Sequence, residues 1–212
     1  GVRDVDYVLT TRELARMIKR CDIDFRALED TIPSSPLAKY TGAGVIFGAT
    51  GGVMEAALRS VRDILENKDY TDVDFGVIRG AGEGIKEAEL EIAGNKLTIA
   101  VVHGAVNFPQ MFERIKQNPE KYAFVEFMAC TGGCVNGGGQ PVICAETLET
   151  IDVRAERAKA LYNIDAKKDL RKSHQNPDVI ELYKEYLEKP GSHKAHDILH
   201  THYTKKDKYS KL

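Results

Sequence analysis

The sequence predicts an α/β fold, with one layered lobe over residues 1–150 and a helical region over residues 151–212. Two observations support this prediction. In the first part, short apolar runs of strand length alternate with amphipathic helical patterns, an order that builds a parallel or mixed sheet flanked by helices. From Ile151 onward the chain is polar and shows only helical spacing, so we expect helices that bury one narrow stripe and wrap around the lobe.

The first expected elements are a strand and two helices. Residues 5–9 are rich in β-forming side chains and predict a strand, and Thr11 is a suitable N-cap for a helix over residues 12–20. Residues 53–68, VMEAALRSVRDILENK, predict a longer amphipathic helix, whose shared apolar face comprises Met54, Leu58, Val61 and Leu65.

The remaining elements follow further apolar runs. Residues 74–80 predict a short strand. Residues 85–104 alternate, turn at residues 93–95 and become continuously apolar over residues 98–102, which predicts a hairpin whose second arm is buried on both faces. A helix over residues 109–118 and a core strand over residues 122–128 come next, and the C-terminal region predicts helices at residues 154–162, 178–188 and 193–200.

Composition limits the classes of function. The chain has 212 residues, 42% of them hydrophobic and 29% charged, and its net charge of -2 leaves no basic surplus to attract nucleic acid. No apolar run approaches the roughly 20 residues that span a bilayer, and no signal-peptide pattern opens the sequence. We therefore expect a cytoplasmic protein without a membrane span or a nucleic-acid partner. Four cysteines are too few for a disulfide framework, so a close pair of them indicates metal or redox chemistry.

That close pair lies in residues 127–141, FMACTGGCVNGGGQP, where Cys130 and Cys134 flank two glycines. In a helix each glycine would cost about 1 kcal/mol relative to alanine, so we expect a loop at the end of the preceding strand. Glycine permits positive φ, and the amides of residues 131–134 and 137–139 are expected to point at an anionic iron–sulfur cluster, whose iron the thiolates would bind. The alternatives are a buried pair of free thiols, a short-loop disulfide, and a zinc site, for which His103 is the one further candidate ligand.

A second glycine-rich segment, TGAGVIFGATGG, has five glycines in residues 41–52. A dinucleotide-binding loop has similar glycines but follows an apolar strand, and the preceding residues PSSPLAKY do not form one. The alternative is a tight loop that packs against a neighbouring lobe, with Phe47 as a pocket plug or a core anchor. Farther on, His193, His196 and His200 share one helical face, but no further ligand stands beside them and solvent-facing histidines are expected.

Three long stretches resemble one known family, and they occur in that family's order. FMACTGGCVNGGGQP resembles the third cluster-binding signature of iron-only (FeFe) hydrogenases, and TGAGVIFGATGGVMEAALR resembles the glycine-rich segment that precedes it. RKSHQNPDVIELYKEYLEKPGSHKAHDILHTHY resembles the family's small-subunit-like C-terminal region. The resemblance implies one lobe of a two-lobed hydrogenase catalytic domain, followed by the small-subunit-like region.

In that family four cysteines hold the H-cluster, a 4Fe-4S cubane joined to a two-iron site. The resemblance implies that Cys130 binds the cubane and that Cys134 both binds the cubane and bridges to the two-iron site. It also implies that Met128 packs against the cluster and that Phe47 and Gly48 line the pocket. An apolar wall of this kind excludes water from the iron.

The resemblance also predicts what lies outside this chain. In the family, the two signatures that carry the other two cysteine ligands precede a sequence such as GVRDVDYVLTTRELARMIK. We therefore expect a fragment that is inactive alone, holds no complete cluster and contains no assigned catalytic residue. Its expected partners are dihydrogen and protons as substrates, ferredoxin or accessory iron–sulfur or NAD(P)-linked subunits as electron partners, and the missing N-terminal half.

The lobe face toward that missing half is expected to expose apolar surface, which predicts self-association. Two other classes of protein stay open. One is a hydrogenase-like, non-catalytic iron–sulfur protein with an assembly or sensor role. The other, ranked last, is a nucleotide-binding module.

Overall fold

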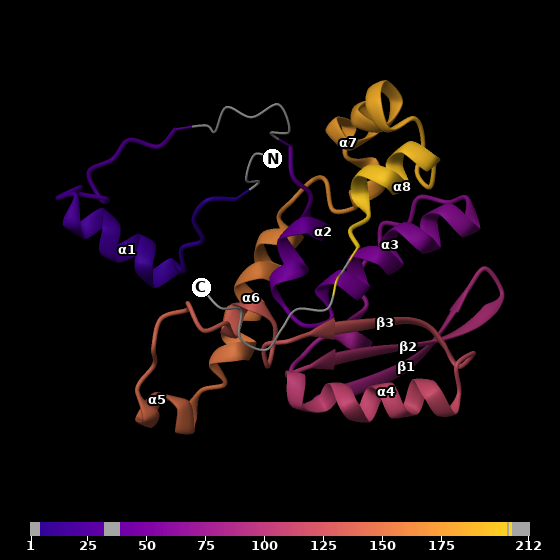
Figure 1. The fold of residues 1–212 in the computed structure, drawn as a ribbon, viewed down its shortest axis with the longest axis horizontal. Helices are drawn as coiled ribbons and strands as arrows, with labels where there is room; N and C mark the ends of the chain where they lie inside the picture. Colours follow the sequence, from indigo (N-terminus) through magenta and orange to yellow (C-terminus); the bar gives the residue numbers. More distant parts are fainter. Residues whose placement is uncertain (1–4, 32–38, 203, 205–212) are drawn as a thin grey trace.

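The computed structural model of the protein describes residues 5–31, 39–202 and 204. Its centre is a mixed three-stranded sheet in the order β1-β2-β3. Strand β1 (Ile85–Ile92) runs antiparallel to β2 (Asn95–His103), and β2 runs parallel to β3 (Tyr122–Met128). Helix α3 (Gly52–Glu66) covers one face of the sheet and α4 (Phe108–Gln117) covers the other (Figure 1). The predicted α/β class with a mixed sheet and flanking helices is confirmed.

Strand β2 is buried on both faces, as its apolar run predicts. Ile99 and Val101 belong to a core cluster with residues of α3, whereas Ala100 and Val102 pack with Met111 of α4. All four β2 side chains are at most 2% exposed. The predicted hairpin is also confirmed, because β1 and β2 are joined at residues 93–94, both of which have positive φ.

Helix α3 begins and ends close to its predicted bounds, and Met54 and Leu58 are buried as expected, but the other half of the predicted apolar face is not buried. Val61 and Leu65, expected on the apolar face, are exposed. The helix instead buries a polar stripe of Glu55, Arg59 and Asp63, which are four residues apart and so lie on one face. This stripe is buried because the C-terminal region supplies oppositely charged partners for it.

The N-terminal elements differ from the prediction in three respects. Residues 5–9 form no strand, since no strand within the described ranges pairs with them. Helix α1 (Thr11–Arg20) is capped by Thr10 rather than Thr11, because Thr10 is extended and forms a reciprocal capping box with Glu13. Residues 74–80, expected as a strand, contain the 3-10 turn η2 (Gly76–Ile78).

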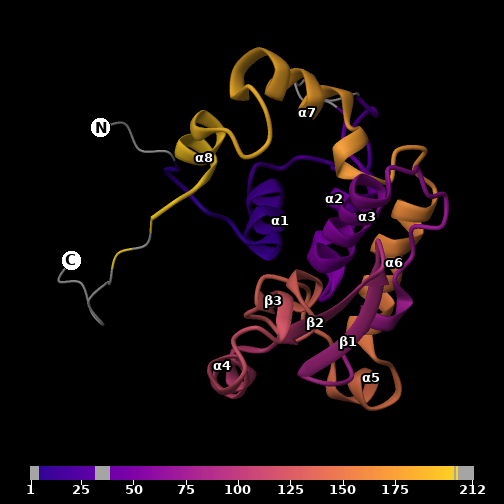
Figure 2. The same cartoon turned by 90° about the vertical axis from the view of Figure 1, so that its right-hand side faces the viewer.

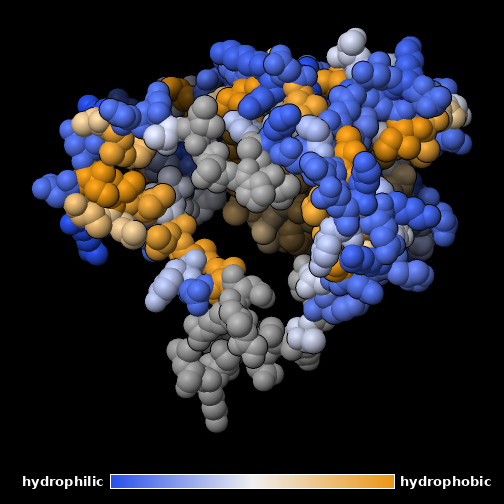
Figure 3. Space-filling model, turned by 90° about the horizontal axis from the view of Figure 1, so that it is seen from above, coloured by the Kyte–Doolittle hydropathy of each residue, from blue (hydrophilic) through white to orange (hydrophobic). Residues whose placement is uncertain are grey.

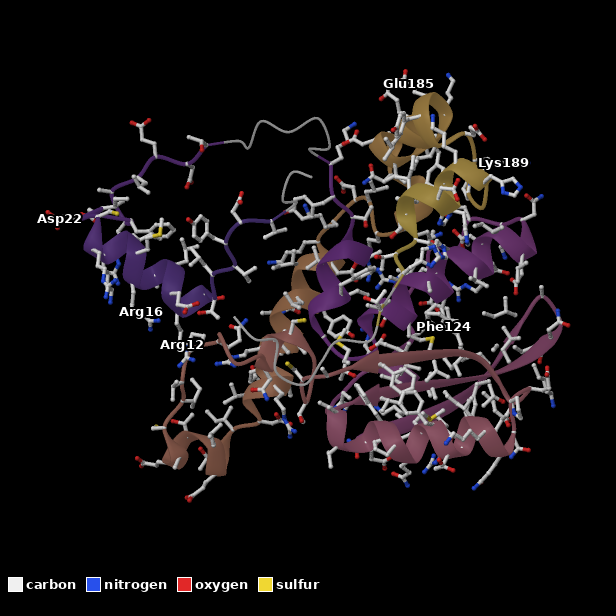
Figure 4. All side chains as sticks on the ribbon, viewed as in Figure 1. Arg12, Arg16, Asp22, Phe124, Glu185 and Lys189 are labelled. Atoms are coloured by element: carbon white, nitrogen blue, oxygen red, sulfur yellow. The ribbon has the colours of Figure 1, made fainter. Side chains whose placement is uncertain are left out.

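Helix α1 and its flanking segments lie apart from the sheet and its helices (Figures 1 and 2). One hydrogen bond to the rest of the chain comes from Arg12 Nη2, which donates to the carbonyl of Gly138 at 2.6 Å; Figure 4 shows Arg12 at the start of α1. Many apolar side chains of this segment are exposed, and hydrophobic residues gather at this end of the molecule in Figure 3. These exposed residues are Val5, Tyr7, Val8, Leu9, Leu14, Met17, Ile23, Phe25 and Leu28.

The C-terminal region is helical, as predicted. After α5 (Ala145–Thr150) at the end of the lobe, its helices are α6 (Val153–Ala166), α7 (Pro177–Leu182) and α8 (His193–Leu199), and α7 continues into the π-helical turn η6 (Tyr183–Leu187). Helix α6 packs across α2 (Gly42–Val45), the 3-10 turn η1 (Ile46–Gly48) and the 3-10 turn η4 (Cys134–Asn136). Two further 3-10 turns are η3 (Ala105–Asn107) and η5 (Ser173–Gln175). None of the helices formed by described residues has the length and apolar character needed to cross a membrane.

A buried ion network joins the C-terminal region to the lobe. The Arg59 guanidinium of α3, which is fully buried, donates to both carboxylate oxygens of Asp165 in α6 at 2.8 Å and to Glu55 at 2.6 Å. Arg171 donates to the same Asp165 carboxylate at 2.6 Å. Burial opposes ionisation of Asp165, but the hydrogen bonds from Arg59 and Arg171 hold its pKa below the usual value. The network fixes α6, and with it the segments on which α6 packs.

Candidate metal centre

The two cysteines lie on a loop that leaves the carboxyl end of β3. Gly132 and Gly133 have φ of +85° and +92°, a region that favours glycine, so the predicted loop conformation is confirmed. Cys130 and Cys134 both carry exposed, unpaired thiols, which removes the disulfide alternative. The chain turns between them through a hydrogen bond from the Gly133 amide to the Cys130 carbonyl at 3.1 Å.

The prediction that the loop amides point at a cluster is wrong for three of them. The amide of Gly132 donates to His103 Nδ1, that of Gly133 to the Cys130 carbonyl and that of Gly137 to the Cys134 carbonyl. These bonds shape the loop itself. Gly137 has a second effect, because a Cβ at that position would stand 4.0 Å from the Cys130 sulfur, so glycine keeps the surroundings of this thiol open.

The second glycine-rich segment packs directly against the cysteine loop. The Thr50 amide donates to the Gly132 carbonyl at 3.1 Å. A Cβ on Gly133 would lie 2.7 Å from the Thr50 nitrogen and 2.8 Å from the Gly48 carbonyl oxygen, so the two backbones touch. No strand precedes this segment among the described residues, and α2 is only four residues long, so the dinucleotide-binding alternative lacks its structural context.

The structure thus brings Gly48 to the loop, where its backbone lies close to Val135 as well as Gly133. Phe47, next to it, leaves 45% of its surface exposed. Met128 ends β3 half-buried, and its carbonyl accepts the Gly104 amide at 2.9 Å. The predicted site residues therefore come from two adjacent segments of one surface.

A buried carboxylate that the sequence reasoning missed holds these two segments together. Glu126 of β3 accepts the Gly51 and Met54 amides at 2.7 Å each, at the N-terminus of α3. Burial raises the pKa of Glu126, and the backbone amides of Met54, Gly51 and Val53 oppose that shift. A single charged residue inside the apolar run YAFVEFM was the available signal, because such a residue is seldom buried without partners.

Other candidate ligands do not complete the site. His103 lies under the loop, but its Nδ1 accepts the Gly132 amide at 3.2 Å and is thereby occupied. His196 of α8 stacks on His200 with ring centroids 4.0 Å apart, but His200 follows the helix in an extended conformation, so the expected helical face of three histidines is not formed. Among the described residues, no three histidine, cysteine, aspartate or glutamate side chains are grouped so that they could hold a metal ion. The zinc reading therefore lacks its ligand set.

The donor set fits one side of an iron–sulfur centre. Thiolates are the ligands that such clusters use, and both thiols are exposed on one loop beside backbone free of bulky side chains. The α/β lobe therefore presents two thiols of the kind that iron–sulfur clusters use, on a glycine loop at the end of a parallel strand.

Comparison with protein families makes the assignment specific. Residues 1–138 match the family described as "Iron only hydrogenase large subunit, C-terminal domain", and residues 151–206 match "Iron hydrogenase small subunit". The chain belongs to the iron-only hydrogenase family.

Several relatives cover most of the chain. It is 50% identical to "Iron hydrogenase 1" of Clostridium pasteurianum over 97% of its own length and 36% of that protein. It is 48% identical to the periplasmic Fe hydrogenase large subunit of Nitratidesulfovibrio vulgaris (76% of this chain, 38% of that protein), and 32% identical to "Protein NAR1" of Arabidopsis thaliana (94% and 42%). A solved structure of a variant of FeFe-hydrogenase HydA1 from Chlamydomonas reinhardtii superposes with a TM-score of 0.71 at 35% identity, covering 94% of this chain and 55% of that one. The chain spans about a third of the curated hydrogenases it matches.

Proposed function

We propose that this chain forms one side of the H-cluster site of an iron-only hydrogenase, an enzyme that interconverts dihydrogen with protons and electrons. The observation that supports this most strongly is the direct packing of the glycine-rich segment on the Cys130–Cys134 loop. Both stretches resemble the family's own, and they meet here although about 80 residues separate them in the sequence.

The proposed roles follow the resemblance residue by residue. Cys130 would bind the cubane, and Cys134 would bind the cubane and bridge to the two-iron site, which supplies the hydrogen chemistry when bound. Met128 would pack against the cluster, while Phe47 and Gly48 would line the pocket. The exposed surface of Phe47 beside the loop supports this, because an apolar side chain there would exclude water once a second lobe closes over it.

The other ligands are proposed to lie outside this chain. A cubane needs four thiolates, and the described residues group only two at this place. The second lobe would supply the rest, and the exposed apolar residues around α1 are the surface we assign to that contact. Residues 1–150 would then be the lobe and residues 151–212 the region that braces it. Electrons would come from ferredoxin or from iron–sulfur or NAD(P)-linked subunits.

We also propose a cytoplasmic location, on the composition of the chain. One relative is named as periplasmic, so the compartment needs a direct test. Fractionation of the source cells, with antibody detection of this chain, provides it.

The function is tested with a chimera. This chain replaces the matching third of the Clostridium pasteurianum relative, and hydrogen evolution is measured with a chemical reductant after maturation. We expect activity in the chimera, its loss in Cys130→Ala and Cys134→Ala, and its retention in Cys21→Ala and Cys144→Ala. A folded chimera that stays inactive under conditions in which the unaltered relative evolves hydrogen would contradict the proposal.

A relative named "Cytosolic iron-sulfur assembly component 3" of Rattus norvegicus, 31% identical over 95% of this chain, supports a second candidate, a non-catalytic iron–sulfur protein with an assembly or sensor role. The same chimera separates the two. If the chimera binds cysteine-dependent iron but turns over no hydrogen, the second candidate is favoured.

A further inference from the structure

His103 is a buried histidine directly beneath the cysteine loop. It ends β2, stands opposite Met128 in the parallel register and is 3% exposed. Its backbone is held on both sides, because its amide donates to the Gly84 carbonyl at 2.9 Å and its carbonyl accepts the Asn107 side-chain amide at 2.7 Å. The imidazole is therefore presented to the loop from a rigid position.

The hydrogen bond to Gly132 fixes the tautomer of His103. The Gly132 N–H can only donate, so Nδ1 must carry a lone pair, and the ring proton of the neutral imidazole stands on Nε2. Burial lowers the pKa of His103, and the positive charges of Arg154 and Lys86 act in the same direction. Nε2 is buried and makes no hydrogen bond to the described residues.

Gly132 lies midway between the two cysteines and is held at both ends of its backbone. Its amide is fixed by His103 Nδ1, and its carbonyl accepts the Thr50 amide. A Cβ at Gly132 would stand 3.2 Å from the Arg154 side chain, and the φ of +85° also favours glycine, so a larger residue there would strain the loop. The conformation of the loop between the thiols therefore depends on these two hydrogen bonds.

We propose that His103 is a positioning residue of the metal-binding loop: its neutral imidazole holds the Gly132 amide through Nδ1 and so keeps Cys130 and Cys134 in one arrangement. It does not bind the metal, because the nitrogen that faces the loop is already an acceptor. This inference rests on the proposed function only for the identity of the metal group that Cys130 and Cys134 bind. The hydrogen bond itself can be tested on the 212-residue chain.

The first experiment is NMR on the ¹⁵N-labelled chain. We expect an unprotonated Nδ1, a protonated Nε2 and a scalar coupling across the hydrogen bond between the Gly132 nitrogen and His103 Nδ1. Protonation at Nδ1, or absence of the coupling while the neighbouring signals are sharp, would overturn the proposal.

Two variants test the positioning role. His103→Leu removes the acceptor, whereas the oxygen of the amide in His103→Asn can take the place of Nδ1. We expect His103→Leu to accelerate hydrogen exchange of the Gly132 amide by about tenfold, the factor for loss of one hydrogen bond, and His103→Asn to restore protection. Equal exchange in all three proteins would overturn the role.

The cluster readout is made in the chimera and is independent of turnover. Release of cysteine-bound iron to a chelator should be about tenfold faster in His103→Leu than in the parent, with His103→Asn close to the parent. If the NMR and exchange results hold but the parent chimera carries no iron dependent on Cys130 and Cys134, the proposed function fails while the loop assignment stands. If the parent holds such iron and both variants release it at the parental rate, the positioning role fails and the proposed function stands.

Discussion

Asp165→Asn tests the claim that buried ion pairs fix the C-terminal region to the lobe. The substitution keeps the size of the side chain but replaces one acceptor oxygen by an amide group that donates. Each carboxylate oxygen of Asp165 accepts one hydrogen bond from Arg59 and one from Arg171, so either orientation of the amide turns its NH2 group toward two donors. Arg59 would remain fully buried, and its remaining carboxylate partners would be Glu55, which Arg79 shares, and the half-exposed Asp74 at 3.6 Å.

The expected loss follows from these contacts. Two hydrogen bonds to charged groups contribute about 1.5–3 kcal/mol each, and breaking a buried ion pair by removing one partner costs about 3–5 kcal/mol. We therefore expect Asp165→Asn to lower the free energy of unfolding by about 3–5 kcal/mol. Urea denaturation followed by circular dichroism at neutral pH measures it. Asp169→Asn, at an exposed position on the same segment, is the matched control and should change it by less than about 0.5 kcal/mol. A loss below about 1 kcal/mol in Asp165→Asn would refute the reasoning.

Three further outcomes are expected. Gly133→Ala should destabilise the chain by about 1–3 kcal/mol in urea, because the new Cβ meets the Thr50 backbone at positive φ, whereas Gly138→Ala, with open space around it, should be neutral. The hydrogen bond from Lys121 is the largest of the effects that lower the pKa of Glu87 to about 2, so this carboxylate should add stability above about pH 4.5 that disappears toward pH 2. Glu87→Gln should remove about 1 kcal/mol of that pH dependence after allowance for solvent screening. The free energy of unfolding at pH 7 and at pH 2 measures it. Leu14 lies on the exposed face of α1, so Leu14→Glu should leave the free energy of unfolding unchanged within about 0.5 kcal/mol. It should reduce self-association of the chain, measured by sedimentation velocity. Equal association of the parent and the variant would count against this face as a contact surface.

The elements that the sequence predicts correctly are those whose pattern is local. The hairpin, α3, α4 and β3 have recognisable patterns of apolar residues, and Ala93 and Gly94 mark the turn of the hairpin. The strand expected at residues 5–9 depends on a neighbouring strand, and local β propensity cannot supply one. The burial of Arg59 could not be read from the sequence either, because its partner Asp165 lies 106 residues away.

The candidate site shows the same division. The cysteine loop was predictable, since two glycines between two cysteines exclude a helix and favour a turn with positive φ. The supports of the loop were not predictable. Glu126 and His103 act through contacts with residues 72 and 29 positions away, at Met54 and Gly132, and only the packing of the sheet brings these pairs together.

The central claim is that Cys130 and Cys134 form only part of a cluster site. The most direct test is the iron and sulfide content per chain after anaerobic reconstitution of the 212-residue protein, with Cys130→Ala and Cys134→Ala beside it. We predict far less than one 4Fe-4S cluster per chain, with the small amount of bound iron reduced further by either substitution. A full cluster per chain that either substitution abolishes would show that the chain supplies all the ligands itself, and it would contradict the account.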